Sequence, residues 1–133
     1  MLLPHVISEE IKIIAFVGLG GAIGSIARYL VQDYIGAHDF PWGTFVVNFI
    51  GSTLISIIFF SSFVAELSPY IKVFLFVGIF GGFTTMSSFS LDTVGLIIAE
   101  RFGAAFFNIV LNGGLCVLGA LAGRWFTMLK NAA

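Results

Sequence analysis

One stretch in the middle of the chain constrains the fold more than any other. Residues 78–90 read Gly-Ile-Phe-Gly-Gly-Phe-Thr-Thr-Met-Ser-Ser-Phe-Ser, inside a hydrophobic run from Tyr70 to Ala99. This run is about 30 residues long, whereas a straight membrane helix needs only ~20. Glycine tolerates non-helical backbone, and Ser and Thr hydroxyls can satisfy the backbone groups that a broken helix frees. The pattern predicts a membrane helix broken near the bilayer midplane.

The amino-acid composition is typical of a membrane-embedded chain. Of the 133 residues, 59% are hydrophobic and 10% are charged, with a mean hydropathy of +1.08. A soluble domain carries about 25% charged residues. We therefore expect an all-α integral membrane protein. Six basic and seven acidic residues nearly cancel, so nucleic acid is not an expected partner.

The hydrophobic pattern divides the chain into four predicted spans within one membrane domain, 1–133. Ser8-Glu9-Glu10 is a reasonable helix start after a short amphipathic lead. Four spans place both termini on one side, and four of the six basic residues fall on that side. This weak bias favours cytoplasmic termini. It is small enough that both orientations are expected to insert, which permits an antiparallel pair. The spans are residues 13–32, 42–64, 70–99 and 102–128.

Small residues are spaced for close helix packing. Gly20 and Gly24 lie four residues apart on the first span, and Gly119 and Gly123 do so on the fourth. Such pairs let another helix approach closely. We expect these faces and the broken helix to drive self-association into a dimer. In an antiparallel dimer the two breaks would meet at the two-fold axis, where facing carbonyls make a dehydrated cation site.

Three polar side chains inside the spans are functional candidates by default. Arg28 either extends to the membrane interface or attracts anions at a vestibule. Asn48 either donates to an anion in a pore or bonds a neighbouring helix. Asn112 is interpreted first as a helix-to-helix contact. Five hydroxyls between positions 84 and 90 suggest a polar track.

The sequence also argues against other functions. A proton-coupled drug exporter of this size needs a carboxylate at the midplane, and no acidic residue falls at the centre of a span. There is no cluster of His, Cys and carboxylates, so we predict that the chain is not an enzyme. The single cysteine, Cys116, is expected to be a buried, inert thiol.

Three motifs together resemble the Fluc (CrcB) family of fluoride channels over essentially the whole chain. The resemblance implies a multi-pass protein of the cell membrane that works as an antiparallel, dual-topology dimer with two fluoride pathways. It implies passive efflux of cytoplasmic fluoride, which relieves fluoride toxicity. The motifs are Gly20-Gly21-Ala22-Ile23-Gly24 followed by Arg28, Pro41-Trp42-Gly43-Thr44-Phe45-Val46-Val47-Asn48, and Gly81-Gly82-Phe83-Thr84-Thr85-Met86-Ser87-Ser88-Phe89-Ser90.

The resemblance also assigns roles by position. It implies a structural sodium ion at the dimer centre, held by the main-chain carbonyls of Gly81 and Thr84. It places Asn48 and Phe89 in the fluoride pore and Arg28 near the vestibule. The remaining pore positions are Met86, Ser88 and Thr85.

This chain departs from the family pattern at two positions. Met86 replaces the first of two pore phenylalanines and has no positive ring edge to present to an anion. A family serine of the fourth span falls on Gly114 in a loose alignment. The partner is accordingly either a second copy that tolerates Met86 or a related chain in a heterodimer, and a subunit that conducts only with such a partner is a further alternative.

Overall fold

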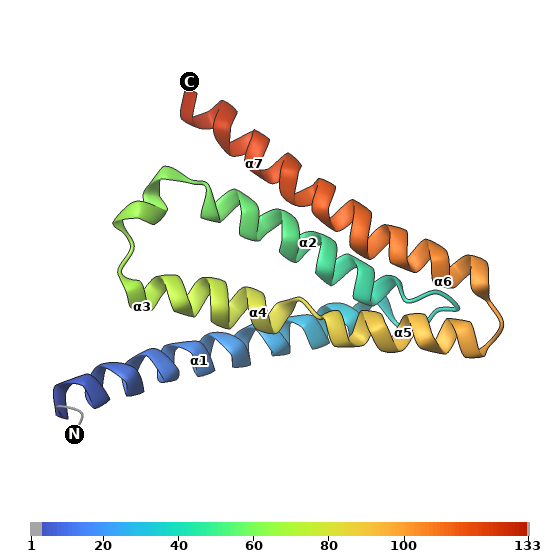
Figure 1. Ribbon diagram of the computed structural model, residues 1–133, viewed down its shortest axis with the longest axis horizontal. Helices are drawn as coiled ribbons and strands as arrows, with labels where there is room; N and C mark the ends of the chain where they lie inside the picture. The colour runs from blue at the N-terminus through green and yellow to red at the C-terminus, as the bar shows by residue number, and fades with distance from the viewer. Residues whose placement is uncertain (1–3, 133) are drawn as a thin grey trace.

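The computed structural model describes the backbone of residues 4–132 and the side chains of residues 8–131. Every regular element in that part of the chain is helical. Four helices are long and apolar enough to cross a membrane: Ser8–Ile35, Trp42–Phe59, Pro69–Ile98 and Phe102–Asn131. The chain is therefore a multi-pass membrane protein, as predicted. Both described ends of the chain lie at the same end of the molecule (Figure 1).

The first span is one uninterrupted helix, α1, from Pro4 to Ile35. The predicted helix start at Ser8 is wrong, because the helix already runs through it. At its other end α1 stops at Gly36, whose φ of 76° is left-handed and therefore suits glycine. The Gly36 N–H donates to Gln32 O at 3.0 Å and closes the last turn.

The second span, α2, is shorter than predicted. It covers Trp42–Phe59, with Pro41 preceding it, and does not continue to residue 64. After Phe60 the backbone of Ser61 is extended, and the Ser61 hydroxyl donates to Ile57 O at 2.6 Å. A short 3₁₀ helix, η1 (Ser62–Glu66), then leads to the third span.

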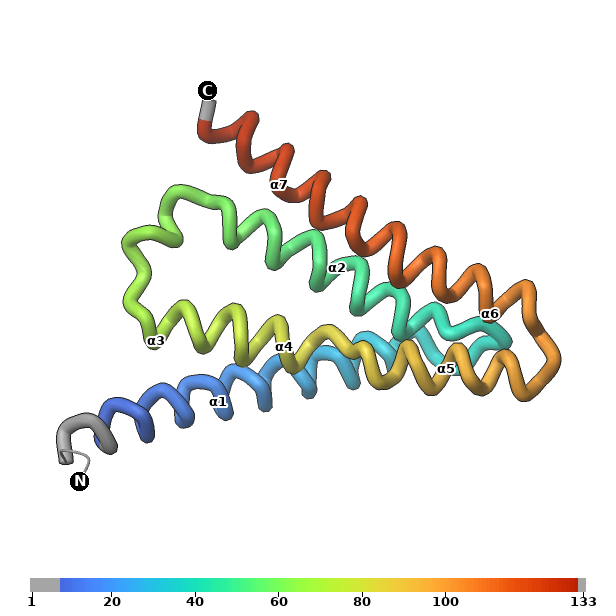
Figure 2. The backbone as a smooth tube through the Cα atoms, viewed as in Figure 1, coloured from blue at the N-terminus to red at the C-terminus, as the bar shows by residue number. Residues whose placement is uncertain are grey.

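The third span is broken, as the sequence predicts. It consists of α3 (Pro69–Lys72), a π-helical segment η2 (Val73–Ile79), α4 (Phe80–Phe83) and α5 (Met86–Ile98). Thr84 and Thr85 between α4 and α5 are extended, with ψ angles of 154° and 112°. The interruption is visible as the bend in the tube between α4 and α5 (Figure 2). Ser68 caps the start of α3 by accepting from the Ile71 N–H at 3.4 Å.

The fourth span begins after Glu100, which has a positive φ of 58°. It consists of α6 (Phe102–Ile109), a π-helical segment η3 (Val110–Leu115) and α7 (Cys116–Ala132). It lies beside α2 along much of its length (Figure 1). A buried Ser56 hydroxyl on α2 donates to Ala120 O on α7 at 2.6 Å and ties the two helices together.

The glycine pairs pack helices together within one chain. A Cβ on Gly24 would lie 2.1 Å from Ile79 O, and one on Gly20 would lie 2.4 Å from Phe74 O, so α1 touches the backbone of the third span. On α7, a Cβ at Gly119 would lie 2.5 Å from the Thr53 hydroxyl of α2. Close packing at these pairs is confirmed. The expectation that they serve self-association is wrong, because the same chain already covers them.

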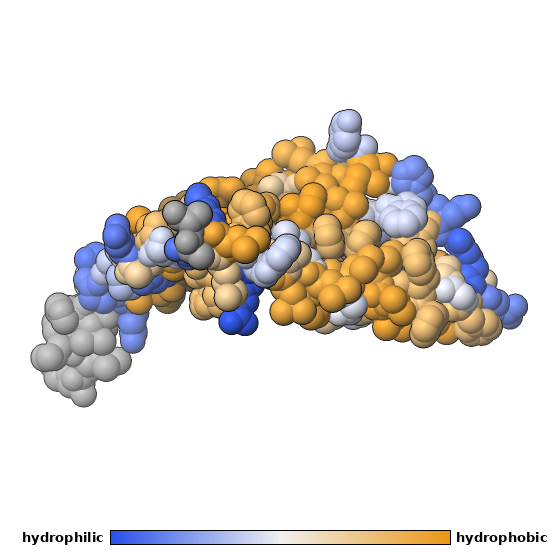
Figure 3. All heavy atoms as spheres, turned by 90° about the horizontal axis from the view of Figure 1, so that it is seen from above, coloured by the Kyte–Doolittle hydropathy of each residue, from blue (hydrophilic) through white to orange (hydrophobic). Residues whose placement is uncertain are grey.

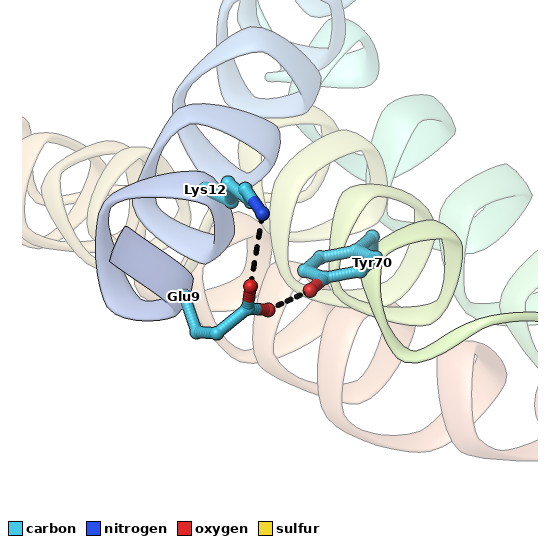
Figure 4. A network of polar contacts seen from close by, with 3 residues as sticks. All are labelled: Glu9, Lys12 and Tyr70. Carbon is cyan, nitrogen blue, oxygen red and sulfur yellow. Dashed lines mark hydrogen bonds and ion pairs between the residues drawn. The ribbon is translucent and has the colours of Figure 1, made fainter. Parts of the chain in front are cut away.

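The outer surface suits a lipid environment. Figure 3 shows hydrophobic residues across the middle of one face and hydrophilic residues mainly toward its two ends. At the end nearest the N-terminus, Lys12 Nζ lies 2.9 Å from Glu9 Oε1. The Tyr70 hydroxyl donates to the other carboxylate oxygen of Glu9 (Figure 4). This cluster ties the start of the third span to α1.

Candidate functional site

A cavity of about 220 Å³ lies beside the break and unites three of the four spans. It collects four of the predicted pore positions from α2 and the third span, and adds residues of the fourth span that were not predicted. Ser88, the fifth predicted pore residue, is not part of the lining. The lining residues are Asn48, Ser52, Thr84, Thr85, Met86, Phe89, Asn112, Gly113 and Cys116.

Asn48 holds the break itself. Its Oδ1 accepts from the Thr85 N–H at 2.7 Å, and its Nδ2 donates to Thr85 O at 3.1 Å. The Asn48 side chain of α2 thus supplies the acceptor that the Thr85 N–H lacks at the break, and it adds a donor to Thr85 O. Nδ2 also donates to Asn112 Oδ1 at 2.8 Å, which engages both N–H groups of the Asn48 amide. Of the two alternatives for Asn48, the bond to neighbouring helices is present in the structure.

The hydroxyls of the predicted polar track mostly satisfy local backbone. Thr85 Oγ1 caps α5 by accepting from the Ser88 N–H at 3.1 Å, and it donates to Ser88 Oγ at 3.1 Å. Thr84 and Ser90 each donate to the carbonyl four residues earlier, at 2.9 Å. Such bonds are the ordinary behaviour of Ser and Thr in membrane helices. The hydroxyls of this track therefore serve mainly to end α4 and to begin α5.

At the break, two backbone N–H groups donate to side chains and not to the carbonyls that would accept from them in a continuous helix. In a continuous helix, Gly81 O accepts from the Thr85 N–H and Thr84 O accepts from the Ser88 N–H. Here the Thr85 N–H donates to Asn48, and the Ser88 N–H donates to the Thr85 hydroxyl. Gly81 is also solvent-accessible in the isolated chain. These are the same two carbonyls that the resemblance assigns to sodium, and oxygen ligands suit a hard cation.

Two of the side chains expected at the pore, Met86 and Phe89, differ in exposure. Met86, at the first turn of α5, is 74% exposed, whereas Phe89 is half-buried. Both line the cavity, and their spacing of three residues places them on one side of α5. Cys116 faces the same cavity and is buried, as predicted for this thiol.

Asn112 is the residue of the fourth span that sequence analysis undervalued. Its side chain lines the cavity and contacts Asn48, whereas Gly114, to which the family serine was aligned, is not in the lining. The interpretation of Asn112 as a helix-to-helix contact is confirmed by this bond. The sequence did not predict that Asn112 lines the cavity, because the π-helical segment η3 determines which side chains of this span face inward. The one available signal was that Asn112 is a second amide in the middle of a span.

A larger cavity of about 510 Å³ opens at the loop end of the molecule. Inside it the Thr44 hydroxyl of α2 donates to Asp92 Oδ2 of α5 at 2.6 Å, and Gln32 Nε2 donates to Thr44 at 3.4 Å. Gln32, Asp92 and Arg101 all contribute to its lining. Arg28 is half-buried one turn earlier on α1 and is not among the lining residues. Its role at a vestibule stays a prediction.

These observations define the class of protein: a helical membrane protein of four spans with a polar cavity at a broken third span. The family model for "CrcB-like protein, Camphor Resistance (CrcB)" matches residues 15–124. The match covers the second and third spans entirely and most of the first and fourth. The chain therefore belongs to the CrcB family, as the motifs at Asn48 and around the break predicted.

Relatives in several bacteria carry one name. The fluoride-specific ion channel FluC of Shewanella pealeana is 41% identical over 114 residues, which cover 84% of this chain and 92% of the relative. The FluC of Rhizobium meliloti is 41% identical over 116 residues, 83% of this chain and 91% of the relative. That of Magnetococcus marinus is 40% identical over 114 residues, 83% and 93% respectively. Ion channels are not enzymes, so these names confirm the prediction of a non-enzymatic protein.

Proposed function

We propose that the chain is a fluoride-selective channel of the cell membrane that lets cytoplasmic fluoride leave passively. The observation that carries the proposal is the cavity beside the break, where Asn48, Thr85 and Phe89 meet in a chain whose relatives are named fluoride-specific. Because a channel only dissipates gradients, net efflux follows when fluoride accumulates inside the cell. Hydrogen fluoride enters and ionises there, so the channel would relieve fluoride toxicity.

The chemistry asked of the cavity is to replace the hydration shell of a small anion. Its lining offers the N–H groups of Asn48, the Ser52 hydroxyl and the positive ring edge of Phe89. Asn112 and Thr84 also line it, but their donors already bond Asn108 and Phe80 O. Asn48 Nδ2 already donates to Thr85 O and Asn112 Oδ1. An arriving anion must therefore compete with a neutral carbonyl for an N–H group. A compact anion wins that exchange more readily than a large, diffuse one, which is the origin of the proposed selectivity.

The test is ion flux from liposomes that contain the purified protein. We expect fluoride efflux and no chloride efflux, and we expect Asn48→Asp to abolish fluoride flux. The carboxylate has no N–H for Thr85 O or Asn112 Oδ1, and it repels an anion. Glu66→Gln in η1, which is not part of the cavity lining, is the control and should conduct like wild type. Equal fluoride and chloride fluxes would overturn the selectivity proposal.

The working unit we propose is an antiparallel dimer of this chain with a second copy or a related chain. The break supports this, because Gly81, whose carbonyl has lost its helical donor, is exposed on the isolated chain at membrane depth. Polar groups at that depth need protein around them. Fluoride flux from the purified single chain identifies a homodimer that tolerates Met86. Flux that appears only with a related chain identifies a heterodimer.

A sodium ion at the dimer centre is the remaining part of the proposal. The Gly81 and Thr84 carbonyls have lost their usual helical donors to Asn48 and Thr85, and they fit a cation that takes oxygen ligands. A bound ion would join the two breaks electrostatically. We expect that replacing sodium by N-methyl-glucamine lowers fluoride flux or the thermal stability of the dimer. If neither changes, the carbonyls are satisfied in another way.

A further inference from the structure

The two hydrogen bonds between Asn48 and Thr85 clamp the break, and they are one end of a longer series of hydrogen bonds. From Thr85, the series passes to Asn48 of α2 and on to Asn112 Oδ1 of η3. Asn112 Nδ2 donates to Asn108 Oδ1 of α6 at 2.9 Å and to Asn108 O at 3.2 Å. Each amide accepts through its oxygen and donates through its nitrogen, so every bond in this series points the same way.

The chain of bonds then returns to the helix from which it started. Asn108 Nδ2 donates to Thr93 Oγ1 of α5 at 2.9 Å, and Thr93 Oγ1 donates to Phe89 O at 2.7 Å. Thr85 and Phe89 are separated by about one helical turn of α5. The bonds thus form a loop that leaves the start of α5, crosses the second and fourth spans, and closes one turn further along. We call Asn48, Asn112, Asn108 and Thr93 the amide relay.

The far part of the relay is more deeply buried than the cavity. Asn108 is 0% exposed and Thr93 is 8% exposed, and neither lines the cavity. Buried polar groups without water depend on each other, because a missing partner leaves a donor or acceptor unsatisfied. A loss at Thr93 is therefore transmitted to Asn108 and from there toward Asn112.

We propose that Asn108 and Thr93 are positioning residues that hold the Asn48 amide in the one orientation that clamps the break. A flipped Asn48 would set its Nδ2 against the Thr85 N–H and its Oδ1 against both Thr85 O and Asn112 Oδ1, so the Thr85 backbone and the direction of the relay together exclude the flip. The relay is defined by protein groups alone. Only its consequence for fluoride flux rests on the proposed function.

Thr93 offers a matched pair of variants. Thr93→Val keeps the shape of the side chain but removes both bonds, whereas Thr93→Ser keeps the hydroxyl. Cys116, the only cysteine of the chain, is buried and lines the cavity, so its rate of reaction with methyl methanethiosulfonate reports opening beside Asn48. We expect Thr93→Val to raise this rate about 5- to 30-fold and Thr93→Ser to leave it unchanged.

Two controls separate positioning from general loosening. Thr127→Val removes another buried hydroxyl of the fourth span, which bonds Ile57 O and Gly123 O outside the relay; it should not raise the rate. In the background Asn48→Ala, which already breaks the relay, Thr93→Val should add little. The inference is overturned if Thr93→Val has no effect, if Thr93→Ser matches it, or if its effect multiplies fully with Asn48→Ala.

The two proposals fail separately. Thiol reactivity needs no fluoride, so it judges the relay even if wild-type liposomes pass no fluoride, a result that would defeat the proposed function alone. If wild type conducts and the relay holds, fluoride flux should fall in Thr93→Val and recover in Thr93→Ser. Unchanged flux in Thr93→Val, beside a raised thiol rate, would limit the relay to the structure of the break and overturn its role in conduction.

Discussion

The two halves of the third span are held in place by different kinds of contact. Before the break, η2 and α4 lie against α1 with almost no side chain between them, at Gly20, Gly24 and Gly78. After the break, α5 is held by directional hydrogen bonds that reach α2 and α6, including those of Asn48 and Thr93. The first half is positioned by the absence of side chains and the second by the presence of polar ones.

The difference shows what each mechanism can specify. Between apolar helices in lipid, close backbone contact supplies dispersion energy but tolerates no added atom. Hydrogen bonds fix the direction of individual groups, which a broken backbone needs. A chain that must stay broken at one residue therefore combines a tightly packed half, which anchors the helix, with a hydrogen-bonded half, which orients its new start.

The largest effect should come from adding a methyl group where the glycines of α1 contact the third span. In Gly24→Ala the new Cβ would lie 2.1 Å from Ile79 O, and neither backbone can move without separating α1 from the third span. We expect a loss of more than ~3 kcal/mol of unfolding free energy, measured by unfolding in detergent micelles. Gly18→Ala on the same helix has nothing within 4 Å of its Cβ and should unfold like wild type. Similar losses in both would contradict the packing account.

Alanine should be tolerated better at the glycine of α2 that contacts the break itself. A Cβ at Gly51 of α2 would lie 2.4 Å from Thr84 Cγ2. This obstacle is a side-chain methyl, which moves aside if Thr84 turns about χ1 and gives up its bond to Phe80 O, whereas Gly24 meets a main-chain carbonyl. We expect Gly51→Ala to cost about 1–2 kcal/mol in the same unfolding measurement. A cost as large as that of Gly24→Ala would show that the break is as rigid as the glycine contact.

The cap of α5 tests the hydrogen-bonded half directly. Thr85→Val removes the oxygen that accepts from the Ser88 N–H at 3.1 Å, and we expect a cost of about 1 kcal/mol. Thr85→Ser keeps the oxygen and serves as the matched control. Hydrogen exchange of the Ser88 amide should quicken in the valine variant only. Equal exchange in both variants would mean that the cap does not secure this turn.

The smallest effect concerns the pairing of α2 with α7. Ser56→Ala removes a buried bond between two helices, to Ala120 O, and should cost about 0.6 kcal/mol. Ser61→Ala removes a bond to Ile57 O within the same turn of chain and should cost less. Thermal unfolding of the two variants side by side measures the difference. A larger loss in Ser61→Ala would reverse the comparison between cross-helix and local bonds.

Much of the architecture was predictable because lipid imposes simple rules. The apolar runs predicted four spans, and Gly81-Gly82 followed by Thr84-Thr85 predicted the break, since these residues both weaken and satisfy a helix. The cavity residues Asn48 and Phe89 came from motifs. The partners of the glycine pairs were not predictable, because spacing indicates that a helix approaches but not which one.

The relay shows a different limit of sequence reasoning. Thr93 and Asn108 are 15 residues apart, and they meet only because the turn at Glu100 brings α5 and α6 side by side in one register. The π-helical segment η3 then shifts the positions beyond Asn108. In a span with such a segment, the side chains on one face do not recur every 3.6 residues. The sequence therefore predicted the helix-to-helix bond of Asn112 but not its place in the cavity.

The first helix is longer than its membrane needs. At ~1.5 Å per residue its 32 residues extend about 48 Å, against a hydrocarbon core of ~30 Å. Glu9 and Lys12 favour water over hydrocarbon, so the opening turns of α1 project beyond the lipid while remaining continuous with the span. A dye fixed rigidly to those turns would share the axis of the buried helix, and polarised fluorescence from it would report the tilt of the bundle and the face of the bilayer on which that end emerges.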